Sequence, residues 1–340
     1  MSKASLTEKQ MSVAPQETMF GLIGGFWIAR SIHLAAKLGL ADHFNDMPKP
    51  ITQLATETET EPKSLYRLMR ALASVGIFAE VSPRCFALTP LAVTLQTDAP
   101  NSLRYVAISQ MGDDMSLGWS NGLISLKTGE IAFDAAAGMS LWEYHAQHPE
   151  DGIAFSRSMS NLGNPAGQAI VKNYDFSQFK TIVDVGGAQG SLLVEILQEH
   201  PTLKGILFDR PEVVAHVRLD GMNIQTVAGD FFESVPSGGD AYLLRIIIHD
   251  WNDEKASMIL KNCHRAMPDG AKLLLFEGII PEGNEPSPLK FVDLLMLMVT
   301  GGRERTEEEY RLLLRSNGFE LTQVIPTPSV FFSIIEAVKL

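Results

Sequence analysis

Two regimes of hydrophobic and polar patterning follow one another along this chain of 340 residues. From about residue 175 onward, short runs of apolar, often β-branched residues alternate with segments in which apolar residues recur at helical spacing. This alternation predicts a doubly wound α/β domain with a mostly parallel sheet. The predicted strands are 181–185, 205–209, 224–228, 241–248, 272–277, 320–325 and 329–337.

The end of the chain carries two further signals. The last two predicted strands are joined by Pro326-Thr327-Pro328, and so short a link requires an antiparallel pair at the sheet edge. Before these strands, Thr306 and Glu309 have the spacing of a capping box, which predicts the start of the last helix, and Gly318 predicts its end.

The first half of the chain has helical periodicity instead. Apolar residues recur at helical spacing from Met19 to Leu40, and this stretch has too few polar residues to form a solvent-exposed face. This helix is therefore expected to be buried, with a second subunit as its cover. Residues 100–165 are also predicted to be helical, with glycine breaks and clustered methionine, tryptophan and phenylalanine.

Between these helical stretches, residues 50–92 predict a winged-helix unit, with a helix that begins at Pro62 and short strands at 77–81 and 85–88. Winged helices often bind DNA, but the helix that would enter a groove has few cations and follows several acids. These residues are Lys63, Arg67 and Arg70, preceded by Glu57, Glu59 and Glu61. Together with a net charge of −12, they favour a packing or dimerisation role, and no nucleic-acid partner is expected.

Composition narrows the remaining classes. A hydrophobic share of 45% and a charged share of 20% are ordinary for a globular protein. Two cysteines exclude a disulfide framework and disfavour a thiolate metal site, so no metal is expected. The polar start of the chain lacks a signal-peptide pattern, and Arg30, His33 and Lys37 interrupt the apolar run after it. We expect a cytoplasmic protein without a membrane partner.

A strand, a glycine turn and an apolar helix follow one another between residues 181 and 197, and they predict a site for a nucleoside cofactor. Gly186, Gly187 and Gly190 let the main chain approach a ligand closely, and the start of the helix offers backbone N–H groups. Asp209 ends the next strand, 23 residues after Gly186, where a carboxylate can hold a ribose hydroxyl.

The third strand ends in Gly229, Asp230 and Phe231, an acid and an aromatic ring that could bond and cover an adenine. A dinucleotide fold competes with this interpretation, but its glycines are spaced G-x-G-x-x-G, and the loop at 186–190 is spaced differently. A helix cap or a turn is the alternative role for Asp209 and for Asp230. Three such strand ends in succession favour a ligand site.

A candidate acid–base group lies at the same edge of the sheet. His249 follows the apolar run 241–248, where open α/β sheets hold their ligands. An imidazole titrates near neutrality and can take a proton from a hydroxyl nucleophile. Glu277 ends the next strand and should project beside His249, and Glu304 lies in the loop before the last helix. A satisfied structural role is the alternative for His249, and a first-turn helix charge is the alternative for Glu304.

These motifs, taken together and in order, resemble the plant caffeate and hydroxyindole O-methyltransferase family and its bacterial tailoring relatives over nearly the whole chain. They are Asp184-Val185-Gly186-Gly187, Phe208-Asp209-Arg210-Pro211, Gly229-Asp230-Phe231, His249-Asp250-Trp251 and Glu304-Arg305-Thr306. The resemblance implies a Rossmann-like class I methyltransferase domain, a mostly helical winged-helix dimerisation domain, and S-adenosyl-L-methionine as cofactor.

The resemblance also implies roles for residues that would hold the cofactor. They are Gly186, Asp209, Gly229, Asp230, Phe231 and Arg245. By motif position, Asp209 takes the ribose hydroxyls and Asp230 with Phe231 meets the adenine, while Arg245 stands where plant members usually have a lysine. Family loops usually read G-G-G-x-G, and the departure at Ala188 and Gln189 narrows the approach to the cofactor.

In the family pattern, His249 is the general base, and Glu277 and Glu304 flank it and stabilise the imidazolium. The residues implied to line the acceptor pocket are Trp142, His145, Phe155, Met159, Leu295, Met298 and Val299. Lignin-pathway members have a substrate-binding asparagine at the position of Val299. An apolar side chain there disfavours a caffeate-type acceptor and favours a larger aromatic or polyketide-like hydroxyl compound.

Three regions are expected: a dimerisation domain at 1–100, a helical linker lining the substrate pocket at 101–170, and the catalytic domain at 171–340. The leading hypothesis is a homodimeric O-methyltransferase of secondary metabolism that methylates a phenolic or enolic hydroxyl. A second hypothesis keeps the fold and cofactor but uses the sulfonium charge for hydroxylation, decarboxylation or a pericyclic step, as the altered glycine loop allows. The third hypothesis is a winged-helix DNA-binding regulator.

Overall fold

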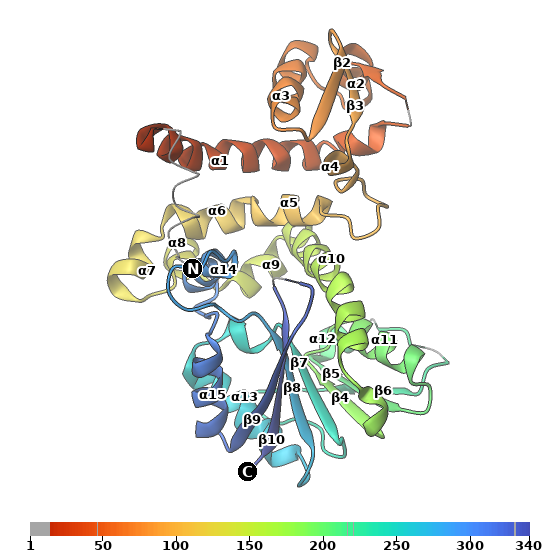
Figure 1. Cartoon of the computed structure of the whole chain (residues 1–340), viewed down its shortest axis with the longest axis vertical. Helices are drawn as coiled ribbons and strands as arrows, with labels where there is room; N and C mark the ends of the chain where they lie inside the picture. The colour runs from red at the N-terminus through yellow and green to blue at the C-terminus, as the bar shows by residue number, and fades with distance from the viewer. Residues whose placement is uncertain (1–13, 46, 216, 220, 330) are drawn as a thin grey trace, which may run out of the picture. The chain divides into compact units, whose positions relative to one another are not determined.

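The computed structural model describes residues 14–45, 47–215, 217–219, 221–329 and 331–340, and the side chains of 163–166 lie outside this description. The chain divides into two compact units, Met1–Asp113 with Pro149–Leu162, and Asp114–His148 with Gly163–Leu340. Helix α10, Pro149–Asn173, begins in the first unit and ends in the second (Figure 1).

The first unit contains the predicted winged helix. Besides the start of α10, this unit contains α1 (Pro15–Lys37), η1 (Leu40–His43), β1 (Lys49–Pro50), α2 (Ile51–Glu57), α3 (Pro62–Ser74), β2 (Phe78–Ser82), β3 (Cys85–Leu88), α4 (Pro90–Val93) and α5 (Arg104–Gln110). The three strands pair antiparallel in the order β1-β3-β2. Helix α3 starts where the Glu61 carboxylate accepts hydrogen bonds from the N–H groups of Lys63 and Ser64, and it buries Leu65 and Met69 in the core.

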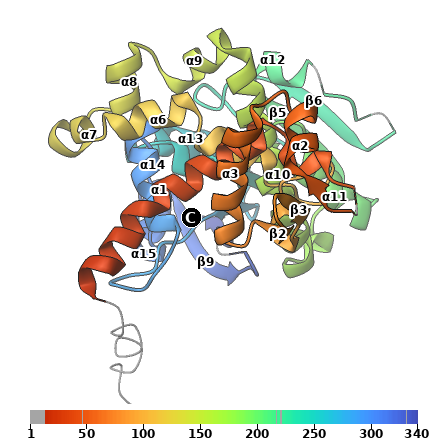
Figure 2. The ribbon, with the colours of Figure 1, turned by 90° about the horizontal axis from the view of Figure 1, so that it is seen from above.

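Most of the apolar side chains of helix α1, which was expected to be covered by a second subunit, are exposed within one chain. Leu22 is 72% exposed and Phe26 is 64% exposed. The polar residues of the helix bind the end of α5 instead. The Arg30 guanidinium donates to the carbonyl of Met111, and Nδ1 of His33 lies 3.1 Å from the carbonyl of Ala107. The N-terminal half of α1 extends beyond α2 and α3 of its own unit (Figure 2).

Among the described residues, α1 is the one helix long and apolar enough to cross a membrane, by length and composition alone. The sequence pattern could not tell which cover the apolar face needs, because the periodicity records only that a cover is needed.

The predicted linker at 101–170 is not one structural region. Its helices are α5, α6 (Asp113–Ser120), α7 (Leu123–Thr128), α8 (Ala132–Ala137), α9 (Leu141–Gln147) and α10. Helix α5 packs against α1 and belongs to the first unit, whereas α8 packs against α7, α9 and α14 (Leu289–Val299) in the second. Residues 101–170 are therefore divided between the two units by the helices they pack against, and composition does not reveal these packing partners.

The second unit is built on a seven-stranded sheet in the order β6-β5-β4-β7-β8-β10-β9. Its strands are β4 (Thr181–Val185), β5 (Lys204–Asp209), β6 (Ile224–Ala228), β7 (Ala241–Arg245), β8 (Lys272–Glu277), β9 (Phe319–Pro326) and β10 (Ser333–Lys339). The first five are parallel, and β10 pairs antiparallel with β8 and β9, as the short link predicted. The doubly wound α/β prediction is confirmed.

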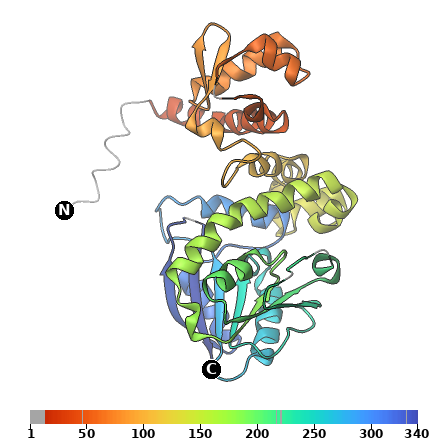
Figure 3. The same ribbon diagram turned by 90° about the vertical axis from the view of Figure 1, so that its right-hand side faces the viewer.

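Helices cover both faces of this sheet (Figure 3). They are α11 (Ser191–Glu199), α12 (Pro211–Val214), α13 (Asp253–Ala266) and α15 (Glu307–Ser316), with the end of α10. One core joins α13 and α15 to the sheet through Ile259 and Leu314, and the other joins α11 and α10 through Leu193 and Ile170. The carboxyl ends of β4, β5 and β7 meet at one edge, since Asp184 pairs with Leu207 and with Leu243.

Two strand boundaries differ from the sequence prediction. Strand β7 ends at Arg245 rather than at residue 248, because Ile246 has a left-handed backbone with φ +56°. His249 therefore lies in a 3₁₀ turn, Ile248–Asp250, and not directly after a strand. Strand β10 begins at Ser333 and not at residue 329. The capping box of Thr306 and Glu309 is present at the start of α15.

Candidate active site

The glycine loop after β4 is shaped so that side chains cannot fill it. Gly186 has φ +71°, and a Cβ there would lie 2.7 Å from Cδ1 of Ile247. A Cβ at Gly187 would lie 2.5 Å from Oδ2 of Asp184. Gly190 has φ +75° and precedes α11. Glycine is therefore required where this loop packs against Ile247 and Asp184, just before the start of α11.

Ala188, the departure from the family loop, adopts the conformation that a glycine would have. Its φ is +50°, and its N–H donates to Oδ2 of Asp209 at 2.8 Å. A left-handed backbone costs a non-glycine residue roughly 1–2 kcal/mol. The loop keeps its connection to Asp209 despite this strain.

The acids of the neighbouring strand ends point back to the main chain. Oδ1 of Asp209 accepts from the N–H of Arg210, and Oδ1 of Asp230 accepts from the N–H of Phe232, both at 2.7 Å. The turn role considered for Asp230 is therefore present, and it leaves the second carboxylate oxygen for another use. The Phe231 ring lies 6.3 Å from that of Trp251.

Two further predicted cofactor residues have packing roles. A Cβ at Gly229 would lie 2.5 Å from Cε2 of Phe208, so only glycine fits beneath that ring. Arg245 ends β7, and its Nη2 donates to Oγ of Ser191 at 3.1 Å, at the start of α11. Burial raises the pKa of Asp184 to about 6, although the Arg245 charge acts in the opposite direction. Arg245 thus balances a buried acid beside the glycine loop.

His249 and Glu304 form a close pair. Nδ1 of His249 lies 2.6 Å from Oε1 of Glu304, and the two side chains are 12% and 2% exposed. Nε2 of His249 lies 3.5 Å from Oδ1 of Asp250. A carboxylate accepts only, so the bond to Glu304 is donated by the Nδ1–H group, which assigns the tautomer of a neutral ring to Nδ1–H.

The charges around His249 are mostly negative. Burial lowers the pKa of the imidazole, but the carboxylates of Asp250, Glu304 and Glu277 outweigh burial and raise the pKa to about 10. Burial also raises the pKa of Glu277, to about 7. Without a bound cation, the ring is therefore protonated at neutral pH.

Glu277 lies beside His249 as predicted, but it bonds the main chain rather than the ring. Its Oε1 accepts from the N–H groups of Ile247 and Ile248, at 3.0 and 2.8 Å. These bonds replace the sheet ladder that ends at Arg245, and they hold the turn that carries His249. Within the described chain, Oε2 of Glu277 and Oε2 of Glu304 are buried without a hydrogen-bond partner.

Two residues missed by the sequence reasoning, Gly302 and Asp293, complete this centre together with Arg305 of the Glu304-Arg305-Thr306 motif. A Cβ at Gly302 would lie 2.1 Å from the carbonyl oxygen of His249, so only glycine allows the two segments to meet. Asp293 of α14 accepts from the N–H of Glu304 at 2.9 Å. Arg305 is 1% exposed, and it donates to the carbonyl groups of Ile248 and Arg303, one in each segment. A lone acid within an otherwise apolar helix was the signal for Asp293.

The predicted acceptor residues lie on three helices. Trp142 and His145 are on α9, and Nε2 of His145 lies 2.8 Å from Oδ2 of Asp114 in a buried pair. Leu295, Met298 and Val299 are on α14. Phe155 and Met159 are on the part of α10 that belongs to the first unit, and both are half-buried.

Met298 and Val299 are buried within their own unit. A Cβ at Gly118 would lie 2.8 Å from Cγ2 of Val299, and one at Gly122 would lie 2.8 Å from Sδ of Met298. These contacts pack α14 against α6 and the start of α7. Leu295 is half-buried. Lining an acceptor pocket stays a prediction for all seven residues.

Models of two known protein domains match this chain. A model of the O-methyltransferase domain matches residues 121–320, and a model of the O-methyltransferase dimerisation domain matches residues 20–98. This chain belongs to the O-methyltransferase family. The phenazine O-methyltransferase PhzM of Lysobacter antibioticus is 43% identical to it, over 93% of this chain and 94% of that protein.

Two further relatives agree with this family. O-demethylpuromycin-O-methyltransferase of Streptomyces alboniger is 37% identical, over 98% of this chain and 92% of that protein. The solved structure of CalO1, a methyltransferase in calicheamicin biosynthesis, in its S-adenosylhomocysteine-bound form, is 32% identical with a TM-score of 0.86, over 97% of this chain and all of that chain. The predicted family, enzyme class and cofactor are confirmed: this is an S-adenosyl-L-methionine-dependent O-methyltransferase.

Proposed function

We propose that this enzyme methylates a phenolic or enolic hydroxyl of a small aromatic or polyketide-like natural product, with His249 as the general base. The names of the relatives support the compound class, because they act on a phenazine and on demethylpuromycin. The observation that carries the catalytic assignment is the 2.6 Å contact between Nδ1 of His249 and Oε1 of Glu304.

The residues around the glycine loop suit the cofactor. The cradle at Gly186 and Gly187 is closed to side chains, and Asp209 and Asp230 present carboxylates at adjoining strand ends. We assign Asp209 to the ribose hydroxyls and Asp230, Phe231 and Gly229 to the adenine side. Arg245, at the end of β7, donates to Ser191 at the start of α11 and so supports the helix that follows the loop. When bound, S-adenosyl-L-methionine supplies an electrophilic methyl group and a positive charge.

His249 is suited to take the proton from the acceptor hydroxyl. Because Nδ1–H is donated to Glu304, Nε2 is the nitrogen that accepts this proton. A positive charge in the site opposes protonation of the ring and lowers its pKa from the ligand-free value of about 10, which frees the base for the reaction. Glu304 and Asp250 then stabilise the imidazolium that proton transfer forms.

The acceptor residues remain part of this proposal. Trp142, His145, Phe155, Met159, Leu295, Met298 and Val299 are assigned to acceptor binding by motif position. Burial of Val299 against α6 supports an apolar wall at that point, which cannot bond a second hydroxyl of a caffeate-type compound.

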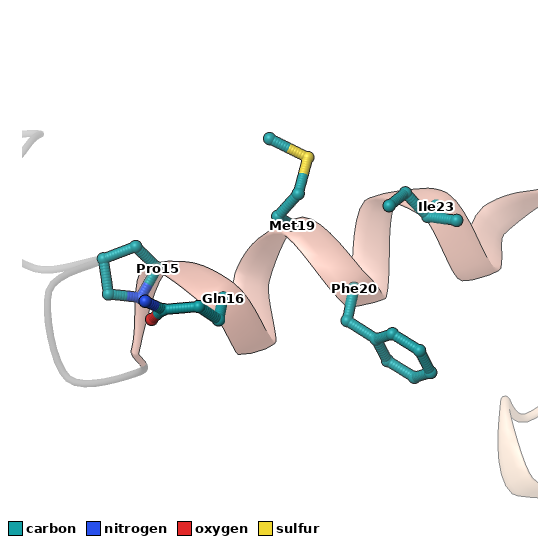
Figure 4. Close-up of a pocket in the computed structure, with 5 residues that line it drawn as sticks. All are labelled: Pro15, Gln16, Met19, Phe20 and Ile23. Atoms are coloured by element: carbon teal, nitrogen blue, oxygen red, sulfur yellow. The ribbon is translucent and has the colours of Figure 1, made fainter.

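A homodimer is the expected assembly, with contact through the N-terminal domain. The matched dimerisation domain supports it, and so does the uncovered apolar surface of α1. Met19, Phe20 and Ile23 project from α1 (Figure 4), and within the part of the chain that the structure describes all three are exposed. The cytoplasm remains the expected location.

Product analysis tests the proposed function. The enzyme is incubated with S-adenosyl-L-methionine and a panel containing 1-hydroxyphenazine and 3-amino-4-hydroxybenzoate, and chromatography follows S-adenosylhomocysteine and the methyl ether. We expect both products in equal amounts. Turnover of an acceptor without S-adenosylhomocysteine would favour the non-methylating hypothesis. That hypothesis rested on the altered loop, and the retained bond from Ala188 to Asp209 gives it no support.

A further inference from the structure

Arg305 is the most buried cation of the catalytic centre, and its donors do not serve a single partner. The side chain is 1% exposed. Nε and Nη2 donate to Oδ1 of Asp253 at 3.1 and 2.7 Å, and Nη2 also donates to the carbonyl of Trp251 at 3.0 Å. Nη1 donates to the carbonyls of Ile248 and Arg303, at 3.2 and 3.3 Å.

These carbonyl groups belong to the two segments that hold the His249–Glu304 pair. Ile248 precedes His249, and Trp251 follows it after one residue. Arg303 precedes Glu304. Additional main-chain contact comes from the N–H of Arg303, which donates to the carbonyl of His249 at 2.8 Å. The guanidinium therefore fixes the base and its carboxylate partner from behind.

We propose that Arg305 is a positioning residue, which sets the separation of His249 from Glu304 by binding the main chain on both sides of that pair. Its planar group with five N–H donors can hold carbonyls in several directions, whereas a lysine ammonium has three donors on a flexible stem. This assignment rests on the proposed role of His249 for its effect on turnover, but its structural part does not.

A purely structural ion pair is the competing role for Arg305. The Asp253 carboxylate that it binds is 58% exposed, and exposed partners contribute little to stability. Three of the five bonds go to carbonyl groups of the catalytic segments instead. The two roles predict different behaviour of the His249 ring, because only positioning changes the strength of its bond to Glu304.

The titration of His249 is the readout that separates these roles. The ring is faced by Asp250 of its own turn, Glu277 at the end of β8 and Glu304 before α15. Arg305 and Tyr310 lie behind these acids, with the guanidinium carbon 5.9 Å from the centre of the Tyr310 ring. Arg305→Lys keeps the positive charge, so a change in the pKa of His249 reports geometry.

The experiment compares Arg305→Lys with Arg311→Lys, which alters another arginine that binds a carboxylate and a carbonyl, on α15. In the ligand-free protein, NMR follows the His249 ring, assigned by the signal lost in His249→Ala. We expect Arg305→Lys to lower the pKa of His249 by about 1, because the contact to Glu304 loosens. With 1-hydroxyphenazine as probe, kcat of Arg305→Lys should fall about 100-fold, while its Kd for S-adenosyl-L-methionine stays unchanged. In Arg311→Lys, the pKa of His249, kcat and this Kd should all equal those of the wild type.

An unchanged pKa of His249 in folded Arg305→Lys overturns the proposal, whatever happens to turnover. A lower pKa without loss of methylation contradicts the base role of His249 and leaves the positioning role standing. If Arg305→Lys does not fold, Asp253→Asn serves as the charge control because it keeps the Oδ1 acceptor, and Asp253→Ala removes this partner of Nε and Nη2 at an exposed position. Asp253→Ala should lower the pKa in the same direction by a smaller amount, and no change in that variant rejects the proposal.

Discussion

Replacing Glu304 by glutamine removes the charge that holds the His249 ring while keeping the size of the side chain. The wild-type Glu304 side chain is 2% exposed, and its Oε1 lies 2.6 Å from Nδ1 of His249, so solvent screens the pair very little. A hydrogen bond to a charged group contributes about 1.5–3 kcal/mol. Since a pKa change of 1 corresponds to about 1.4 kcal/mol, Glu304→Gln should lower the pKa of His249 by about 1 to 2.

The sign of the effect on the rate profile follows from this change. A general base acts in its neutral form, so kcat/KM falls as pH drops below the pKa of the ring in the free enzyme. The wild-type pKa is raised to about 10, and the variant should therefore keep its full rate down to a lower pH. The plateau itself should fall about 10- to 100-fold, because a weaker base forms a less stabilised imidazolium.

The assay is kcat/KM for S-adenosyl-L-methionine against pH, with a saturating acceptor from the panel. Glu308→Gln is the matched control, because Glu308 is exposed on α15 and binds only the exposed Arg311 side chain among the described contacts. If kcat/KM of Glu304→Gln begins to fall at the same pH as in the wild type, this carboxylate does not set the basicity of His249. A plateau equal to that of the wild type would refute its role in turnover.

Two further changes test the loop and the assembly. Ala188→Gly relieves the left-handed alanine, a gain of about 1–2 kcal/mol, but it adds about 0.4–1 kcal/mol of unfolded-chain entropy. Thermal unfolding should therefore change little, and calorimetry should show tighter binding of S-adenosyl-L-methionine; weaker binding would mean that the methyl group makes a favourable contact. Leu22→Glu places a charge on the 72%-exposed side chain of α1 and should convert a dimer to a monomer by light scattering. The control Leu312→Glu, at a 59%-exposed leucine of α15, should leave the dimer intact. If Leu22→Glu is still a dimer, the interface lies elsewhere.

The sequence pattern located the sheet well because its strands are buried and sharply bounded. Strands β4, β6 and β8 have the predicted ends, where glycine or an acid follows an apolar run. Strand β7 was predicted too long, since Ile246, Ile247 and Ile248 continue the apolar run. The left-handed backbone of Ile246 ends the strand at Arg245, and Glu277 then binds the N–H groups of Ile247 and Ile248.

The proximity of His249 and Glu304 was predictable from the order of the family motifs, but the residues that support the pair were not. The sequence gives no sign that Gly302 must approach the carbonyl of His249, or that Arg305 spans two segments, because these contacts join residues about fifty positions apart. The apolar side of α1 was expected to need a second subunit as its cover, and within one chain it is exposed. Apolar periodicity shows that a face needs a cover, and the cover need not come from the same chain.

His249→Ala, measured for methyl transfer and for cofactor binding on the same preparation, tests the central assignment most directly. Loss of a general base reduces turnover by about 100- to 10,000-fold, and the Kd for S-adenosyl-L-methionine should stay within about twofold because no cofactor contact is assigned to the ring. Methylation that persists, or cofactor binding that weakens as much as turnover, would contradict a ring that takes the proton from the acceptor.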